Sequence, residues 1–336
     1  MTDTFKVVFF QRKPYSFHKS VEYIFSDVRR RMPPGITCIT KVVSHYSKGV
    51  LPRMQIAWEA YKNQGDVNHI TGDIHFASLL LKKSRTMLTV LDCGVLSDSK
   101  GLRHVILKYF WFTLPLKSCA LVTVISEATA AELRRYTSYP SNRIFVIPVA
   151  ISAAYKYVPR EFNKTKPEIL LVGTMPNKNI HRLLDAVKGI SCRLNIIGRL
   201  GDDILQKLKE NGIEYRNGFD LSEEQLVAQY QQCDMLSFVS TYEGFGMPIV
   251  EANATGRPVI TSNILSMPEV AGNAALMIDP FDVRDIRNGI LKIIEDDTYR
   301  NQLVQNGLEN CKRFDSELIA GMYLGLYKDI YAGKYS

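Results

Sequence analysis

The chain has 336 residues, of which 46% are hydrophobic and 23% are charged, close to the averages of globular proteins. These values exclude collagenous, disordered and coiled-coil chains, and the length predicts about two domains of roughly 150 residues each. No apolar stretch reaches the ~18 residues that a membrane span needs, and we expect no secretory signal. The 6 cysteines form no CxxC pair, which predicts reduced thiols, a cytoplasmic location and no metal site.

The charge is divided unevenly along the chain. Residues 1–150 carry 21 Lys and Arg against 10 Asp and Glu, a balance of +11, whereas residues 151–336 carry 21 against 24, a balance of −3. A basic half predicts an anionic partner, namely a phosphorylated substrate, an anionic membrane face or nucleic acid. The charge is compatible with nucleic acid, but the sequence contains no recognised nucleic-acid-binding motif.

Short apolar runs alternate with helical spacings through the first half. We expect strands at 5–10, 36–43, 66–70, 86–91, 120–125 and 143–148. Helices are expected at 21–31, around 76–80, at 102–116 and directly after Ser126, a good N-cap residue. Buried runs of this kind predict an α/β fold with a parallel sheet covered on both faces.

The pattern restarts after a polar segment at 152–167, which we interpret as an interdomain linker. Strands are expected at 168–172, 193–197, 213–216, 235–239, 258–261 and 275–278, with helices at 180–187, 202–211, 222–231 and 248–254. Two more helices, 283–295 and 315–331, are expected to close the chain. Open parallel sheets bind ligands beyond the carboxyl ends of their strands, so the loops that follow strands are the candidate sites.

The most specific loop is TYEGFGMPIVE, residues 241–251, which follows a predicted strand directly. Gly244 and Gly246 let the backbone approach a ligand closely, and the next residues begin a helix whose free amides suit an anion. Glu243 and Glu251 can accept hydrogen bonds from sugar hydroxyls. The alternative is an ordinary helix-initiating turn with an acidic residue in its first turn.

Two other strand exits place cations at the same expected edge. Lys178 follows the strand exit at Gly173, and Arg199 follows the next strand along the chain. Together they suit a diphosphate. A solvated lysine and a salt-bridged arginine are the alternatives.

These segments resemble the nucleotide-sugar half of glycosyltransferase family 4, of the glycosyl transferases group 1 type. The matching motifs are Gly173-(x4)-Lys178-Asn179, the strand leading to Gly198, EGFGMPIVE (243–251), GRPVITS (256–262) and PEV (268–270). The resemblance covers most of residues 168–331. In the first half it is looser and is limited to LTVLDCG (88–94), WFTLP (111–115) and VTVISEAT (122–129).

The resemblance implies a GT-B fold, with two Rossmann-like parallel-sheet domains facing a central cleft. It implies an acceptor-binding domain at 1–151, a linker at 152–167, a nucleotide-sugar-binding domain at 168–314 and a C-terminal helix at 315–336 that crosses back to the first domain. The implied enzyme is a retaining hexosyltransferase that needs no metal or cofactor. It would move a sugar from a UDP- or GDP-sugar to a glycan or lipid-linked glycan in bacterial surface polysaccharide synthesis (lipopolysaccharide, capsule or exopolysaccharide).

The resemblance also implies roles for residues of the second half. Glu251 would hold the ribose diol, and Glu243 would hold the donor sugar together with the amides of Gly244, Phe245, Gly246 and Met247. Lys178 would neutralise the departing diphosphate, beside Gly173 and Thr174. Fixed cations and aligned amides stabilise developing charge without reorganising, which is commonly the largest catalytic contribution.

The sequence departs from the family pattern at two positions. Thr174 stands where many relatives carry an arginine, and we expect Arg199 to supply that charge. Leu91 stands where relatives tend to carry a histidine before Asp92. His75, after another strand exit, is the candidate replacement as a catalytic residue, the alternative being a locally bonded helix-start histidine.

We expect the acceptor to bind the first half, at Arg12, Lys13, Tyr15 and Asp92. Cations and rings together suit a phosphorylated lipid or sugar, whereas a solvated loop is the alternative. The segment 100–117 mixes basic and aromatic residues and could lie in a membrane interface. Because apolar residues almost encircle it, an ordinary buried helix is favoured.

Two other functions are compatible with these residues. One is a nucleotide-sugar epimerase of the same fold, which the spacing of Glu243 and Glu251 disfavours. The other is a catalytically silent partner of an active glycosyltransferase, which Leu91 leaves open. For the enzyme we expect a cytoplasmic location, with peripheral contact to the inner, anionic face of the cell membrane and no nucleic acid partner.

Overall fold

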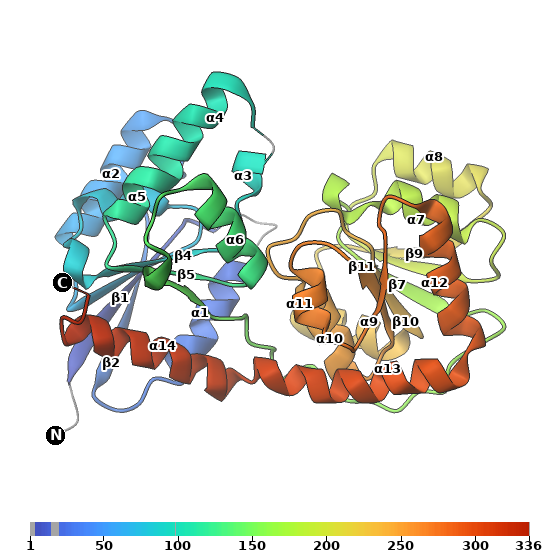
Figure 1. Cartoon of the computed structure of the whole chain (residues 1–336). Helices are drawn as coiled ribbons and strands as arrows, with labels where there is room; N and C mark the ends of the chain where they lie inside the picture. Colours follow the sequence, from blue (N-terminus) through green and yellow to red (C-terminus); the bar gives the residue numbers. More distant parts are fainter. Residues whose placement is uncertain (1–3, 15–19, 98, 336) are drawn as a thin grey trace. The chain divides into compact units, whose positions relative to one another are not determined.

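A computed structural model describes residues 4–14, 20–97 and 99–335 (Figure 1). The chain divides into two compact units. The first contains the residues up to Ala150 together with those from Ser316 onward, and the second extends from Ile151 to Asp315. No helix in the described part of the chain is long and apolar enough to cross a membrane.

The first unit is built on a six-stranded parallel sheet within its described residues. Its strands are β1 (Phe5–Gln11), β2 (Ile36–Val42), β3 (Val67–Thr71), β4 (Thr86–Val90), β5 (Leu121–Val124) and β6 (Ile144–Val146), in the spatial order β2-β1-β3-β4-β5-β6. All strand pairs are parallel. The predicted parallel sheet is therefore confirmed, and its strand order reverses between β1 and β3.

Alternating residues of the strands face two different helical layers. Phe5, Val7 and Phe9 of β1 pack with α1 (Ser20–Arg30) and α14 (Ser316–Tyr331), whereas Val8 and Phe10 face the opposite layer. That layer contains α2 (Val50–Lys62), the 3₁₀ helix η1 (His75–Leu80), α5 (Leu114–Lys117) and α6 (Glu127–Tyr136). Helices on both faces explain why the strands are near-continuous apolar runs.

The second unit has the same design. Its strands are β7 (Glu168–Val172), β8 (Arg193–Ile197), β9 (Glu214–Gly218), β10 (Met235–Phe238), β11 (Val259–Ser262) and β12 (Leu276–Ile278), all parallel and ordered β12-β11-β10-β7-β8-β9. The helices α7 (Ile180–Val187), α8 (Asp202–Glu210) and α12 (Val283–Glu295) cover one face. The remaining helices are α9 (Glu223–Gln232), α10 (Met247–Thr255), α11 (Met267–Ala271) and α13 (Asp297–Asn310). The strand order reverses between β7 and β10.

Two long helices, α13 and α2, were not predicted from the sequence. The prediction that 283–295 and 315–331 close the chain without another helix is wrong, because α13 lies between them. Few of its residues are apolar. Its backbone instead packs closely against α10, where a Cβ on Gly307 would lie 2.9 Å from Asn253 Nδ2. Helix α2 was missed because its apolar residues occupy two sides, one buried and one exposed, so that no single apolar face stands out in the sequence.

The expectation of an ordinary buried helix at 102–116 is also wrong. The segment is helical throughout, as α4 (Gly101–Leu107), a π-helical stretch η3 (Lys108–Thr113) and α5. However, five large apolar side chains are exposed, namely Leu102, Val105, Ile106, Tyr109 and Phe110. They are exposed because only the other side of this helix, with Phe112 and Leu116, packs on the sheet.

Residues 152–167, expected to join two domains, pack within the second unit. Tyr155 is buried against the ring of Tyr230, with 5.5 Å between centroids, and Phe162 packs on the core beneath α7 and α12. Arg160 donates to Asp234 at 3.0 Å. This segment is therefore held by specific aromatic and charged contacts.

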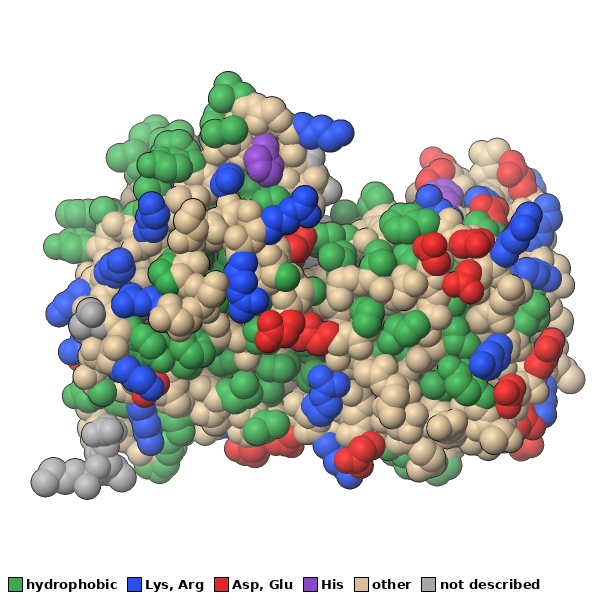
Figure 2. Space-filling view, in the orientation of Figure 1, with side chains coloured by type: hydrophobic (Ala, Val, Ile, Leu, Met, Phe, Trp, Pro, Cys, Tyr) green, Lys and Arg blue, Asp and Glu red, His purple; other side chains and the backbone are tan. Residues whose placement is uncertain are grey.

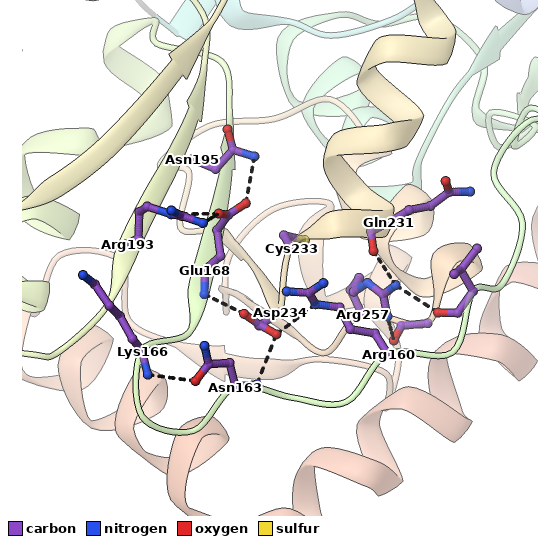
Figure 3. Close-up of polar contacts among 12 residues, drawn as sticks. Arg160, Asn163, Lys166, Glu168, Arg193, Asn195, Gln231, Cys233, Asp234 and Arg257 are labelled. Atoms are coloured by element: carbon purple, nitrogen blue, oxygen red, sulfur yellow. Dashed lines mark hydrogen bonds and ion pairs between the residues drawn. The ribbon is translucent and has the colours of Figure 1, made fainter.

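The buried acids Glu168 and Asp234 lie at the amino ends of strands of the second sheet (Figure 3). Glu168 accepts hydrogen bonds from Arg193 at 2.6 and 3.0 Å and also binds Arg216. Asp234 accepts from the Glu168 amide at 2.8 Å and from Arg160. Since buried carboxylates need partners of this kind, the network ties β7, β8 and β9 to the segment that precedes them.

We expect Glu168→Gln to destabilise the second unit by about 2–4 kcal/mol, because it leaves two arginines facing a neutral amide. Thermal unfolding should show a lower Tm, by about 2–4 °C for each kcal/mol. The control is Glu214→Gln, which removes an exposed ion pair with Lys166 and should leave Tm unchanged. Equal effects of the two substitutions would contradict this account.

Candidate functional site

The candidate site of the second unit lies where its strand order reverses. The loop after β7 contains Gly173 and Lys178, and the loop after β10 contains Glu243. Because β7 and β10 are neighbours whose connections leave toward opposite sides of the sheet, the space beyond their carboxyl ends corresponds to the crevice in which such sheets usually bind ligands.

Lys178 and Glu243 form an ion pair in this crevice. Lys178 Nζ lies 2.6 Å from Glu243 Oε1 and 4.7 Å from the centroid of the Phe238 ring. The two side chains are 19% and 16% exposed, so the pair is shielded but reachable. The lysine stem passes directly over Gly173, where φ is +92° and a Cβ would lie 2.8 Å from Lys178 Cε. A glycine is therefore required both for the turn and for the path of the lysine.

Polar side chains hold the two loops together. The Asn177 carbonyl accepts from the Thr241 amide at 2.8 Å, and its side chain donates to the Tyr242 carbonyl at 2.9 Å. Ser266 Oγ lies 2.9 Å from the Glu243 carbonyl and 2.7 Å from the Phe245 carbonyl. The two loops are thus held in a fixed relative position by hydrogen bonds that join them to each other and to Ser266.

Helix α10 begins at the end of the second loop. Its N-cap is Gly246, with φ of +114°, and a Cβ there would lie 3.1 Å from Ile249 Cδ1. The amides at the start of a helix have no partner within it, so the backbone of Phe245, Gly246 and Met247 offers donors beside Glu243. Gly244, in the same loop, is partly exposed. The predicted role of residues 244–247 in binding a donor sugar stays a prediction.

Glu251 lies one turn further along α10 and is held by two tyrosines. Tyr230 donates to Glu251 Oε2 at 2.5 Å, and the Tyr155 hydroxyl also hydrogen-bonds to Glu251. Burial raises the pKa of Glu251 to about 7, while both phenols and the positive charge of Lys178 act in the opposite direction. Glu251 is therefore close to half ionised at neutral pH, and nearby Lys178 favours its charged form.

Thr174 follows β7, and Arg199 follows the neighbouring strand β8. A Cβ on Gly198 would lie 2.7 Å from Thr174 Cγ2, so the turns after β7 and β8 are in contact. Arg199 is 62% exposed, pairs with Asp220 at 3.1 Å and lies over the Phe219 ring. Its role as a substitute for the missing arginine stays a prediction.

The first unit has a separate cavity at its own strand-order reversal. Its volume is about 350 Å³, and it collects side chains from the loops after β1, β2, β3 and β4. The predicted residues in its lining are Arg12, Lys13, His75 and Asp92, together with Leu91. Tyr15 lies outside the described residues. The sequence did not indicate Tyr46 and Trp111, which line the same cavity.

The charged groups of this cavity are held in place by neighbours. Arg12 donates to Asp73 at 2.8 Å, and Lys13 donates to the Ser44 carbonyl at 3.4 Å and lies 4.9 Å from the Tyr46 ring centroid. Asp92 accepts from the Gly94 amide at 2.8 Å. The cavity therefore combines two cations, two carboxylates and aromatic rings, groups that can hydrogen-bond to a sugar and stack on its face.

His75 is buried and makes a specific hydrogen bond. Its Nδ1 donates to the Trp111 carbonyl at 2.9 Å, and burial lowers its pKa although nearby Asp73 raises it. The ring is therefore neutral at pH 7, with Nε2 as an acceptor. His75 thus makes the local hydrogen bond expected of a structural histidine, and it also lines the cavity. Its catalytic role therefore stays a prediction.

Tyr155, Tyr230, Asn177 and Ser266 are site residues that the sequence did not indicate. Tyr230 occupies a buried helical position and Tyr155 lies in the supposed linker, so each resembles an ordinary packing residue. Their hydroxyls contact Glu251 only because the fold brings these segments together. In the described residues no group of three or more His, Cys, Asp or Glu side chains is placed to hold a metal ion.

A family model matches most of the second unit. Residues 158–310 match the family model described as "Glycosyl transferases group 1". The O-antigen chain mannosyltransferase B of Escherichia coli is 34% identical over 238 residues, which is 63% of this chain and 61% of the relative. The serotype-specific mannosyltransferase WbdA of Escherichia coli is 28% identical over 218 residues, 57% of this chain and 27% of the relative. The chain thus spans less than two thirds of each of these relatives.

The fold is also that of solved structures, among them WaaG, a glycosyltransferase involved in lipopolysaccharide biosynthesis, with a TM-score of 0.72 at 14% identity over 95% of this chain and 99% of that one. The crystal structure of Anabaena HepE in complex with UDP and glucose superposes with a TM-score of 0.79 at 17% identity, covering 97% of this chain and 100% of that one. This similarity confirms the predicted GT-B class of fold.

The ionisation of Glu251 predicts how stability depends on pH. Its pKa is about 7 in the folded protein against an ordinary value of 4.5, so the folded state retains a proton that the unfolded chain has already lost. Stability should therefore fall as the pH rises through this window and level off above it, by at most roughly 3 kcal/mol at 1.4 kcal/mol per pKa unit.

Thermal unfolding from about pH 5 to pH 8 should show this fall in the native protein and not in Glu251→Gln, whose side chain cannot titrate. Glu210→Gln, at an exposed site on α8, should leave the wild-type pH profile unchanged. Parallel pH profiles of wild type and Glu251→Gln would show that Glu251 does not titrate in this range.

Proposed function

We propose that the protein is a glycosyltransferase of the glycosyl transferases group 1 family, whose model matches residues 158–310, and that it transfers a sugar from a nucleotide-sugar donor to a glycan or lipid-linked glycan. We place this reaction in the synthesis of a bacterial surface polysaccharide, at the inner face of the cell membrane. The Escherichia coli relatives are mannosyltransferases, one of them for the O-antigen chain. The HepE structure contains UDP and glucose, which supports a nucleotide-sugar donor.

The observation that carries the proposal is the Lys178–Glu243 pair beside the start of α10. Cleavage of a glycosyl–phosphate bond leaves negative charge on the diphosphate and positive charge on the sugar. The ammonium of Lys178 has three N–H donors, so it can contact the diphosphate while it still holds Glu243. Glu243 and the amides of residues 245–247 then face the sugar. These groups need no rearrangement as charge develops, which makes them effective in the transition state.

Glu251 is proposed to bind the ribose of the donor. Two tyrosines occupy part of its hydrogen-bonding capacity and fix the orientation of the carboxylate, whose remaining lone pairs can accept from a vicinal diol. Because the charged form is the better acceptor, donor affinity should increase as the pH rises through about 7, the pKa of the free site.

We further propose retention of anomeric configuration and independence of metal ions. Lys178 and the helix amides supply positive charge where the diphosphate departs. The acceptor is proposed to bind the first unit, where Arg12, Lys13 and Trp111 line the cavity. The cations suit a phosphate and the indole ring suits the face of a sugar.

The proposal is tested by a thermal-shift screen of UDP- and GDP-sugars, followed by turnover. A matched donor at 100 times its Kd should stabilise the protein by about 2.7 kcal/mol. We expect sugar transfer or slow hydrolysis of the donor. The rate should be unchanged when a metal chelator is added, and NMR of the product should show a retained anomeric configuration. A changed sugar on the free nucleotide would instead identify an epimerase, and binding without any turnover would identify a silent partner.

Removal of the site cation should impair catalysis more than folding. Lys178→Met should lower kcat by about 10²–10³-fold, because the diphosphate loses its fixed charge, while Tm changes little. The matched control is Lys188→Met, which removes an exposed lysine of the same unit and should leave kcat and KM unchanged. An unaltered kcat in Lys178→Met would eliminate its proposed role.

A further inference from the structure

We propose that α2, η1 and the α4–η3 helix of the first unit form a surface that docks onto an anionic lipid membrane. This deepens the membrane location given under the proposed function by assigning it to particular residues. The experiment below requires neither donor nor acceptor, so its outcome is independent of whether sugar transfer is demonstrated.

Helix α2 exposes an apolar stripe on one side. Its exposed large apolar residues are Val50, Leu51, Met54, Trp58 and Tyr61. At about 100° per residue they fall within one arc of about 100°, while Ile56, Ala57 and Ala60 are buried on another side. The stripe therefore remains exposed among the described residues of this unit, although its spacing is that of a helical face that packs against a partner.

The α4–η3 helix exposes a second stripe. Leu102, Val105, Ile106, Tyr109 and Phe110 recur at spacings of i, i+3, i+4, i+7 and i+8 and are all exposed, which is the pattern of a continuous helical face. The helix buries Phe112 and Leu116 on its other side. It is thus anchored to the sheet on one side and apolar toward solvent on the other.

The two stripes belong to one surface. Arg53 of α2 lies 4.7 Å from the centroid of the Trp111 ring of η3 and 6.0 Å from that of Phe76 of η1. Helix η1 adds exposed Leu79 and Leu80. Figure 2 shows hydrophobic side chains gathered over α2 and α4, at the upper left. Monomeric proteins rarely expose a continuous apolar area of this kind unless it binds a partner.

The charges around this surface are almost all positive. The helices α2, η1, α4, η3 and α5 carry Arg53, Lys62, Arg103, Lys108 and Lys117 against a single acid, Glu59. Glu59 is engaged by the amide and hydroxyl of Ser44, at 3.1 and 2.8 Å. The complementary partner is therefore anionic as well as apolar.

A lipid surface fits this combination better than a protein does. Lysine is depleted at protein interfaces, whereas helices that lie on membranes combine an apolar face with lysine and arginine at its border. Trp58 and Tyr61 stack, and Lys62 lies 5.2 Å from the Trp58 ring centroid. Amphipathic rings beside cations are typical of the headgroup level of a bilayer.

The same helices border the cavity of the first unit. Trp111, which contacts Arg53 of α2, also lines the cavity, and so does the exposed Val95. A membrane seated on α2 and α4–η3 would therefore present the headgroup of a lipid-linked acceptor near the residues proposed to bind it.

The test is co-sedimentation of the full-length protein with vesicles of phosphatidylcholine, with and without phosphatidylglycerol. The wild type should bind the anionic vesicles, more weakly as salt rises. The double variant Leu51→Ser/Leu102→Ser removes two side chains that are 73% and 76% exposed. It should lower the partition coefficient by about 10- to 100-fold, because each leucine then buries no apolar surface in the lipid.

The matched control is Leu318→Ser, which removes a leucine that is 53% exposed on α14 of the same unit and should bind as the wild type does. A second variant, Lys62→Gln/Arg103→Gln, keeps the apolar stripes and should lose the preference for anionic vesicles. Unchanged binding by both double variants, or absence of vesicle binding by the wild type, would overturn the proposal. Sedimentation velocity provides a further test. If the wild type self-associates and Leu51→Ser/Leu102→Ser does not, the surface binds a second copy of the chain and the proposal is overturned.

Discussion

The ion pair between Lys178 and Glu243 depends on a constraint of sheet topology. Where the strand order reverses, between β7 and β10, the two chain segments leave the sheet in opposite directions, and polar side chains can meet in the resulting gap without disturbing the core. Gly173 completes the arrangement, because a side chain at this position would occupy the path of the lysine. The charge that the proposed reaction needs is thus a consequence of how the sheet is wound.

Glu251 shows how the surroundings of this pair adjust a third group. Burial favours the neutral acid, whereas Tyr230, Tyr155 and Lys178 favour the carboxylate, and the balance places the pKa at about 7. A ligand that needs the charged form of Glu251 would shift this protonation equilibrium at little cost in free energy. The network around Glu168 lies at the amino ends of the strands, whereas the crevice lies beyond their carboxyl ends, so structural and functional charges are separated within one unit.

The first unit applies the same topology to a different kind of partner. Its strand order reverses between β1 and β3, and the cavity there is lined by Arg12, Lys13, Asp73 and Asp92 together with aromatic rings. Its outer helices expose apolar stripes bordered by lysine and arginine. The basic charge of residues 1–150 is therefore shared between a cavity and a surface, both of which suit ligands that combine negative charge with apolar or sugar groups.

Local patterns in the sequence determined the fold class, the strands, the N-cap Ser126 and the residue set around 241–251, because apolar periodicity and glycine turns act over short distances. Tertiary structure alone decided the Lys178–Glu243 contact, the two tyrosines on Glu251 and the exposure of α2 and α4–η3. These depend on which segments lie side by side in space. A helix such as 102–116 has the same composition whether it packs on one side or on all sides, and Tyr230 becomes a partner of Glu251 only when α9 and α10 pack together.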